Sequence, residues 1–99
     1  MASSTSRVMR GAVVGTGADL DVKTVGFRPR SVKLINQDSA DEMYWHSYMA
    51  DASAFKRVAA GTGSVITTLG ITPLAAGFRL GADTDLNVSG ETVLWEATE

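Results

Sequence analysis

Residues 25–37 read VGFRPRSVKLINQ and combine a tight turn with the strongest strand signal in the chain. Gly26 can adopt a positive φ, while Pro29 fixes its own φ and favours an extended Arg28. The β-branched and aliphatic side chains of residues 31–37 favour a pleated, half-buried strand. The stretch therefore predicts a turn that leads directly into a strand of a β-sheet.

The length and composition indicate one small domain that gains stability from other subunits. The chain has 99 residues, of which 44% are hydrophobic, and this fits a single core. It has no cysteine and one histidine, His46, so a disulfide and a zinc site of about four Cys or His ligands are both excluded. Small domains without such links are often stabilised by oligomerisation. We therefore expect a homo-oligomer.

Charge and hydropathy argue against two classes of partner. Nine basic and eleven acidic side chains are interspersed and give a net charge of −2, so binding to nucleic acid phosphates is not expected. No apolar run approaches the ~20 residues of a membrane span, and residues 1–6 (MASSTS) lack the apolar segment of a signal peptide. We expect neither nucleic acid nor membrane as a partner. We also expect synthesis in the cytosol, with a flexible polar arm over residues 1–6 before a folded domain over residues 7–99.

Alternation of apolar and polar residues predicts an all-β fold of about seven short strands. The expected strands are 7–14, 19–25, 31–37, 42–49, 64–69, 77–81 and 92–97. The alanine-rich residues 50–60 are expected to form an irregular surface excursion, and residues 70–76, which include Pro73, a loop. Trp95 in the last strand is expected to point inward. Turn signals recur about every ten residues, which predicts a compact antiparallel β-sandwich.

The strand expected over residues 42–49 has large side chains on both faces. Met43 and Trp45 lie on one face, and Tyr44, His46 and Tyr48 lie on the other. Trp45 is expected in the core, so the opposite face is expected to meet a partner. Tyr and Arg are enriched in protein interfaces, and aromatic rings also stack on sugars. The arginines expected to join these contact residues are Arg28, Arg30 and Arg79.

A cluster of acidic and amide residues near the C-terminus raises the question of a metal site. Oxygen ligands of the kind that calcium prefers occur at Asp83, Asp85, Asn87 and Glu91. Counting from Asp83, however, the sixth residue is Val88, where an EF-hand loop has glycine. A short strand with Leu86 and Val88 inward is the favoured alternative. Ion binding by Asp83, Asp85 and Asn87 stays open at this point.

Catalytic chemistry is not expected from these residues. Acidic residues flank His46 in the sequence, but no serine, cysteine or lysine stands in a recognisable nucleophile context. The GTG at residues 15–17 would need a following helix to cradle a phosphate, whereas residues 18–22 alternate like a strand. No enzyme activity and no cofactor are therefore expected.

Four motifs are informative as an ordered set. They are a Gly–aromatic–x–Pro turn before a strand (residues 25–36), a GITP segment (70–73), a Gly–Phe hairpin (77–81), and an Asn-x-Ser–Gly turn before a final strand with an aromatic residue (86–97). In this order they resemble small β-sandwich virion proteins of tailed bacteriophages. Each motif alone is ordinary turn chemistry, and the match covers roughly Val14 to the C-terminus.

The resemblance implies a structural protein with no catalytic residues. Its stand-alone members are head decoration (cement) subunits, so we expect a homotrimer that binds the major capsid protein on the capsid exterior, after assembly in the host cytoplasm. In that role the arm over residues 1–6, with Arg7 and Arg10 behind it, would staple neighbouring subunits. The alternative is a tail-associated receptor-binding or carbohydrate-binding module, which would use the aromatic residues. The short chain and its polar arm favour the decoration protein.

Overall fold

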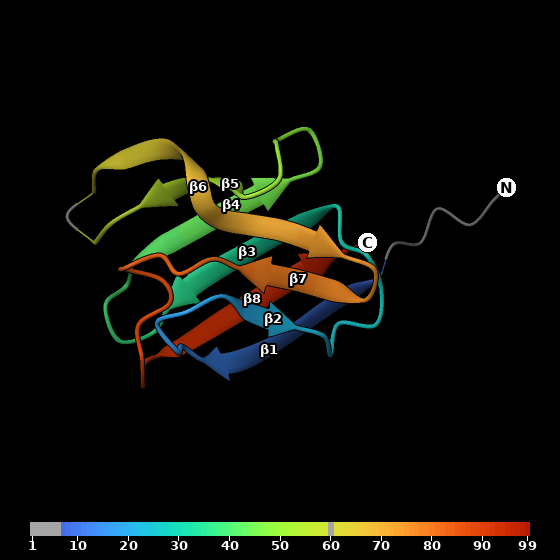
Figure 1. Ribbon diagram of the computed structural model, residues 1–99, viewed down its shortest axis with the longest axis horizontal. Coiled ribbons are helices and arrows are strands. Elements are labelled where there is room, and N and C mark those ends of the chain that lie inside the picture. Colours follow the sequence, from blue (N-terminus) through green and yellow to red (C-terminus); the bar gives the residue numbers. More distant parts are fainter. Residues whose placement is uncertain (1–6, 60) are drawn as a thin grey trace, which may run out of the picture.

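The turn over residues 25–30 and the strand after it have the predicted conformations. In the computed structural model, which describes residues 7–59 and 61–99, strand β3 spans Ser31–Asn36 (Figure 1). Gly26 has a φ of 89°, which residues with a Cβ rarely adopt, and its N–H donates to the carbonyl of Ala76 at 3.1 Å. Buried residues in the turn are Val25, Phe27 and Pro29. The turn is thus anchored to a distant hairpin as it enters the sheet.

Eight strands form one continuous antiparallel sheet. They are β1 (Val8–Val14), β2 (Leu20–Val22), β3 (Ser31–Asn36), β4 (Glu42–His46), β5 (Ser53–Arg57), β6 (Gly63–Leu74), β7 (Gly77–Leu80) and β8 (Thr92–Thr98). Their order in the sheet is β1-β8-β3-β4-β5-β6-β7-β2. The expected all-β, antiparallel fold is confirmed, with one strand more than expected. Among the described residues there is no helix that is long and apolar enough to cross a membrane.

The sheet curls until it is nearly closed into a barrel. β1 and β2 are the two edges of the sheet, yet they follow each other in the chain. In a flat sheet with strands about 4.8 Å apart, these edges would be about 34 Å from each other. The connection over residues 15–19 can span at most about 21 Å. The sheet must therefore bend back on itself (Figure 1), and it forms one curled sheet where a two-sheet sandwich was expected.

The inward face of the curled sheet holds the hydrophobic core. Trp45 on β4 and Trp95 on β8 are 2% and 5% exposed, which confirms that both are core residues. The Trp45 Nε1–H donates to the carbonyl of Ala50 at 3.1 Å, and the Trp95 ring meets Phe78 edge to face at 5.8 Å between centroids. Gly11 on β1 leaves room for Trp95, because a Cβ at this position would lie 2.6 Å from the indole ring.

Residues 50–60 do not form the irregular surface excursion that the sequence predicts. Ser53–Arg57 forms strand β5, which pairs with β4 on one side and β6 on the other. Ala54 is fully buried. Strand pairing on both sides and burial of Ala54 outweigh the helix propensity of the local alanines.

Most of residues 70–76, expected as a loop, belong to β6. The first half of β6 pairs with β5 and the second half with β7, and residues 67–70 bulge between the two halves. The first residue of β5, Ser53, lies opposite Ile71. Since hydrogen-bonding direction alternates along a strand, the nitrogen of Pro73 points beyond the end of β5, where no ladder bond is lost. The glycine and proline therefore mark a bend in a strand.

Candidate functional site

The loops at one end of the barrel are held by buried polar side chains, which are Asn36, Asp41, Asp83 and Asn87. Asn87 connects two parts of the chain. Its Oδ1 accepts the N–H groups of Thr16 and Gly17 at 2.8 and 3.3 Å. Its Nδ2 donates to the carbonyls of Ala18 and Gly81 at 2.6 and 3.0 Å. Asn87 therefore joins the β1–β2 connection to the β7–β8 connection across the seam of the barrel.

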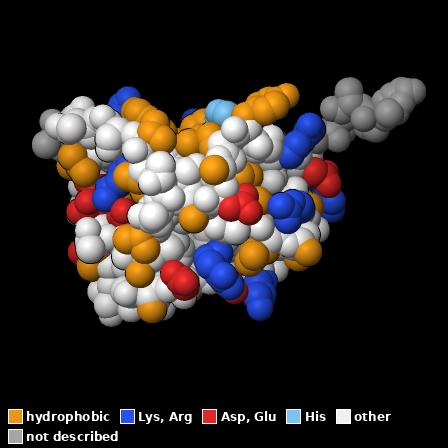
Figure 2. Space-filling view, turned by 45° about the horizontal axis from the view of Figure 1, so that its top comes forward, with side chains coloured by type: hydrophobic (Ala, Val, Ile, Leu, Met, Phe, Trp, Pro, Cys, Tyr) orange, Lys and Arg blue, Asp and Glu red, His pale blue; other side chains and the backbone are white. Residues whose placement is uncertain are grey.

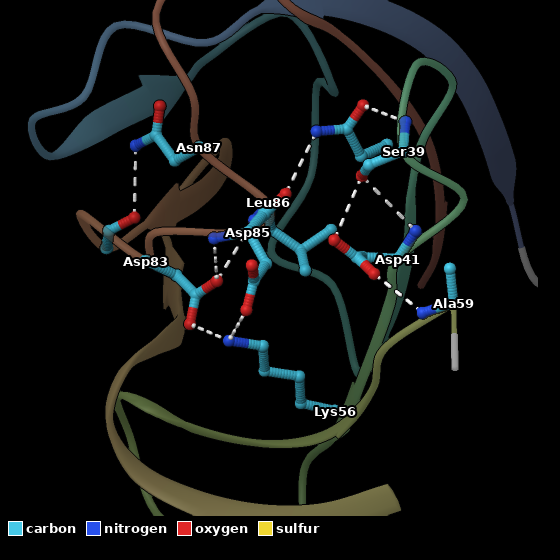
Figure 3. A network of polar contacts seen from close by, with 10 residues as sticks. Ser39, Asp41, Lys56, Ala59, Asp83, Asp85, Leu86 and Asn87 are labelled. Atoms are coloured by element: carbon cyan, nitrogen blue, oxygen red, sulfur yellow. Dashed lines mark hydrogen bonds and ion pairs between the residues drawn. The ribbon is translucent and has the colours of Figure 1, made fainter. Parts of the chain in front are cut away.

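Asp83 has three donors around its carboxylate (Figure 3). Its Oδ1 accepts the N–H groups of Asp85 and Leu86 at 2.9 and 3.0 Å, and its Oδ2 lies 2.9 Å from the Nζ of Lys56. Lys56 also lies 2.7 Å from Asp85. Burial lowers the pKa of Lys56, but hydrogen bonds to Asp83 and Asp85 and their negative charges outweigh it and raise the pKa overall. The amine therefore stays protonated as the counter-ion of a buried carboxylate.

These contacts show what the residues for which ion binding stayed open do in the structure. Glu91 accepts a hydrogen bond from Asn36 Nδ2 at 2.8 Å, so it too has a partner within the chain. No group of three His, Cys, Asp or Glu side chains is placed to hold a metal ion within residues 7–59 and 61–99. The short strand expected here is wrong, because residues 82–91 form turns and Asn87 is buried, although Leu86 points inward as expected. We call Lys56, Asp83, Asp85 and Asn87 the polar cluster.

Two of the acidic residues near His46 in the sequence, Asp38 and Asp41, bond to turns away from it. Asp41 precedes β4 and its Oδ1 accepts the N–H of Ala59 at 2.7 Å, while Asp38 Oδ2 accepts the N–H of Thr92 at 2.9 Å. His46 lies at the other end of β4. The two carboxylates therefore hold turns at the polar end of the barrel.

A row of aromatic side chains starts on the outer face of β4 and continues into the turn after it, because the strand ends at His46 and not at residue 49 as expected. Tyr44 and His46 are 5.7 Å apart between ring centroids, and His46 and Tyr48 are 6.2 Å apart, both edge to face. Phe55 on β5 lies directly opposite Tyr44 in the sheet register. We call these four residues the aromatic stripe. Tyr48 is 96% exposed, and Figure 2 shows the single histidine, in pale blue, between side chains coloured as hydrophobic.

A hollow of about 380 Å³ lies beside the stripe, on the outside of β1, β8, β3, β4 and β5. Besides Tyr44, the exposed apolar residues that line it are Ile35, Phe55 and Leu94, each 38% exposed. Its charged side chains are Arg10, Lys33, Glu42, Arg57 and Glu96. Neighbouring apolar side chains inside a rim of both charges are typical of a contact surface.

Three of the arginines expected at contacts have acidic partners in their own chain. Arg7 donates to Glu99 at 2.9 and 2.6 Å, Arg10 to Glu96 at 2.7 Å, and Arg79 to Asp21 at 2.7 and 3.2 Å. Hydrogen bonds from these arginines hold the pKa values of Asp21 and Glu99 below their ordinary values. A stapling role for Arg7 and Arg10 would require these bonds to break. The arm itself, residues 1–6, lies outside the described residues, so its role stays a prediction.

Arg28 and Arg30 form no ion pair within the part of the chain that the structure describes. Arg30 lines a shallow hollow together with His46 and Tyr48. Arg28 lines a smaller one near the end of β4, which Arg30 also lines. The structure thus brings Arg30 together with the aromatic stripe. Arg79 is on β7, next to the sheet edge, and lines neither hollow.

Ile35, Phe55 and Leu94 are not among the residues that the sequence predicts at a contact site. The alternation in β3 and β8 already places Ile35 and Leu94 opposite the buried side chains of those strands. Only Phe55 lacked a signal, because β5 was not predicted. The site could be found once β5 was known to pair with β4.

Comparison of the chain with protein-family models, with curated proteins and with solved structures finds no match. The function therefore has to be argued from the geometry of the site, together with the motifs that the sequence carries.

Proposed function

We propose that the chain is a structural protein of a tailed-bacteriophage virion, a head decoration (cement) subunit that binds and stabilises the capsid lattice from outside. The observation that carries this proposal is the aromatic stripe. Tyr44 and His46 on the outer face of β4 and Tyr48 in the turn after it lie in a row, and Tyr48 is 96% exposed. The buried polar side chains, by contrast, are engaged in holding loops. A binding surface on a rigid β-fold is what a decoration subunit requires.

The proposed contact works through burial of rings and pairing of Arg30. A buried aromatic side chain removes on the order of 150–250 Å² from water, so the exposed Tyr48 has the most to gain. Arg30 supplies a charged donor beside the rings, and aromatic and arginine side chains together are common at the centres of interfaces. We propose that this surface contacts the major capsid protein and other copies of the chain, which assemble as a trimer.

A second candidate is a tail-associated module that binds a sugar. The hollow of about 380 Å³ favours it, because Tyr44 and Phe55 offer ring faces there beside both donors and acceptors. Apolar pockets with a few polar groups are the usual form of a small-molecule site. In this alternative the hollow holds the ligand, whereas in the first the hollow closes against protein.

The two candidates differ in where the chain lies in the particle. Reconstruction of the intact virion should show density for the chain on the outer surface of the head. Density at the tail tip or on a fibre would support the sugar-binding module. A purified particle without the chain, shown by mass spectrometry of its proteins, would contradict both.

A further inference from the structure

β1 has a free edge among the described residues. It pairs with β8 on one side only, and β2, the other edge of the sheet, pairs with β7. The N–H of Glu99 donates to the carbonyl of Arg7 and the N–H of Gly15 to the carbonyl of Glu91, both at 2.8 Å. Hydrogen-bonding direction alternates along an antiparallel strand. The odd-numbered residues of β1 therefore bond to β8, and the backbone groups of Val8, Arg10, Ala12 and Val14 point away from it.

This edge lacks the features that usually prevent strands from adding to a sheet. Proteins protect edges with proline, bulges or several charges. β1 reads VMRGAVV, has an unbroken register with β8, and carries one charge. Val8, Met9 and Val14 are 43%, 42% and 57% exposed. An edge of this kind is suited to pairing with another strand.

We propose that the edge pairs with β1 of a second copy of the chain, antiparallel and around a twofold axis at Gly11. Val8 then lies opposite Val14 of the second copy, and Arg10 lies opposite Ala12. In this register all four residues with free backbone groups exchange both of their hydrogen bonds with the opposite residue. A twofold contact uses the same surface on both copies, so each copy is satisfied in the same way.

The side chains of β1 fit this register. On the outer face the exposed Val8 and Val14 meet each other, and on the inner face Met9 meets Val13 of the second copy. Arg10 is already bonded to Glu96 at 2.7 Å, and in this register it faces Ala12, so two arginines are not directly opposed. This self-complementarity identifies a second copy as the occupant. The inference does not depend on the phage proposal, since the aromatic stripe is on other strands.

Cysteine cross-linking tests the contact, because the natural chain has no cysteine. The experiment uses two single variants of the full chain, Val8→Cys and Val14→Cys, alone and mixed under mild oxidation. In the mixture we expect at least about tenfold more disulfide-linked dimer than in either variant alone, since opposite Cα atoms lie about 5.5 Å apart, within disulfide range. The two Val8 residues of a pair lie about 20 Å apart, so neither variant should link to itself.

The control is Ala12→Pro, which removes an N–H from the free edge and leaves the bonds to β8 in place. Added to both cysteine variants, it should reduce the cross-linked product at least about tenfold while the circular dichroism spectrum stays unchanged. Three results would overturn the proposal. They are efficient linking of Val8→Cys to itself, no excess of dimer in the mixture, and efficient linking of Ser4→Cys to Val14→Cys, which would place the N-terminal arm on this edge.

Discussion

The polar cluster and the aromatic stripe invert the usual arrangement of a small domain. Asp83 and Asn87 are charged or polar, yet they are 5% and 1% exposed. Tyr48 in the stripe is large and aromatic, yet it is 96% exposed. Both polar side-chain atoms of Asn87, Oδ1 and Nδ2, have hydrogen-bond partners within the chain. Within the stripe, the rings of Tyr44 and His46 and those of His46 and Tyr48 meet edge to face.

The comparison separates structural from functional residues by what surrounds them. A buried polar group is costly unless its hydrogen bonds are made, so the polar cluster contributes to folding and has little capacity left for a ligand. An exposed aromatic ring leaves no hydrogen bond unmade. Its burial in a contact with a partner is favourable. The polar cluster thus holds loops at one end of the barrel, and the aromatic stripe is the surface that we propose for binding.

The largest effect is expected from Lys56→Met. The substitution leaves the buried Asp83 carboxylate without its counter-ion, and breaking a buried ion pair in this way costs about 3–5 kcal/mol of unfolding free energy. Urea denaturation measures this loss. A second substitution, Asp83→Asn, should recover part of it by removing the unpaired charge. The exposed Lys33→Met is the matched control, with a change below about 0.5 kcal/mol. Equal losses for the two lysines would contradict the structural role of the cluster.

A smaller loss is expected from Asn87→Ala. The substitution removes the side chain that bonds both connections across the barrel seam, and each buried group left unpaired costs about 1–3 kcal/mol. Water can reach Thr16 and Gly17, which are exposed, so we expect a total of about 2–3 kcal/mol. Hydrogen exchange should show faster opening of residues 15–19 in this variant. Unchanged protection there, with Ser89→Ala as the surface control, would show that Asn87 does not hold the seam.

The pH dependence should separate the buried pair from the surface pairs. The pKa of Lys56 is raised above its ordinary 10.5, so its contribution to stability is complete below that pH and is lost as the pH rises through the folded value. The pKa of Asp21 is lowered from 3.8 by its hydrogen bonds to Arg79, so its small contribution is complete above 3.8 and is lost in acid. Melting temperatures measured at about ten pH values between pH 2 and pH 12 should show both the alkaline loss and the acid loss.

Two variants test which residue causes each loss of stability. Lys56→Met should remove part of the alkaline loss, and Asp21→Asn should slightly reduce the acid loss. An alkaline loss of the same size in Lys56→Met and the natural chain would contradict the assignment.

The period of two in the sequence was sufficient to predict most of the fold. It placed Trp45 and Trp95 inward and Tyr44 and His46 outward, because strand side chains alternate strictly. It did not predict β5, since Ala54 has a low strand propensity and gains its place only from pairing with β4 and β6. The bend in β6 was missed for a similar reason. Gly70 is a typical loop residue, yet it lies in the strand where a Cβ would meet the carbonyl oxygen of Ser53 at 2.4 Å.

The aromatic stripe and the polar cluster differ in how far the sequence predicts them. Strand alternation alone places Tyr44 and His46 on the outer face, whereas Tyr48, expected on the same strand, lies in the turn after it. The polar cluster depends on Lys56 and Asp83, which lie on different elements. Local patterns contain no information on such a long-range pair, and a metal loop therefore remained an open interpretation until the contacts were known.

The most direct test of the account is binding of stripe variants to phage heads that lack the chain. We expect Tyr48→Ala and Tyr44→Ala to fold normally and each to bind at least about tenfold more weakly than the natural chain, which corresponds to about 1.4 kcal/mol or more. Leu69→Ala is the control, because Leu69 is also an exposed apolar residue, 45% accessible, outside the stripe, and it should bind normally. Full binding of both tyrosine variants, or equal weakening by Leu69→Ala, would contradict the claim that the aromatic stripe is the binding surface.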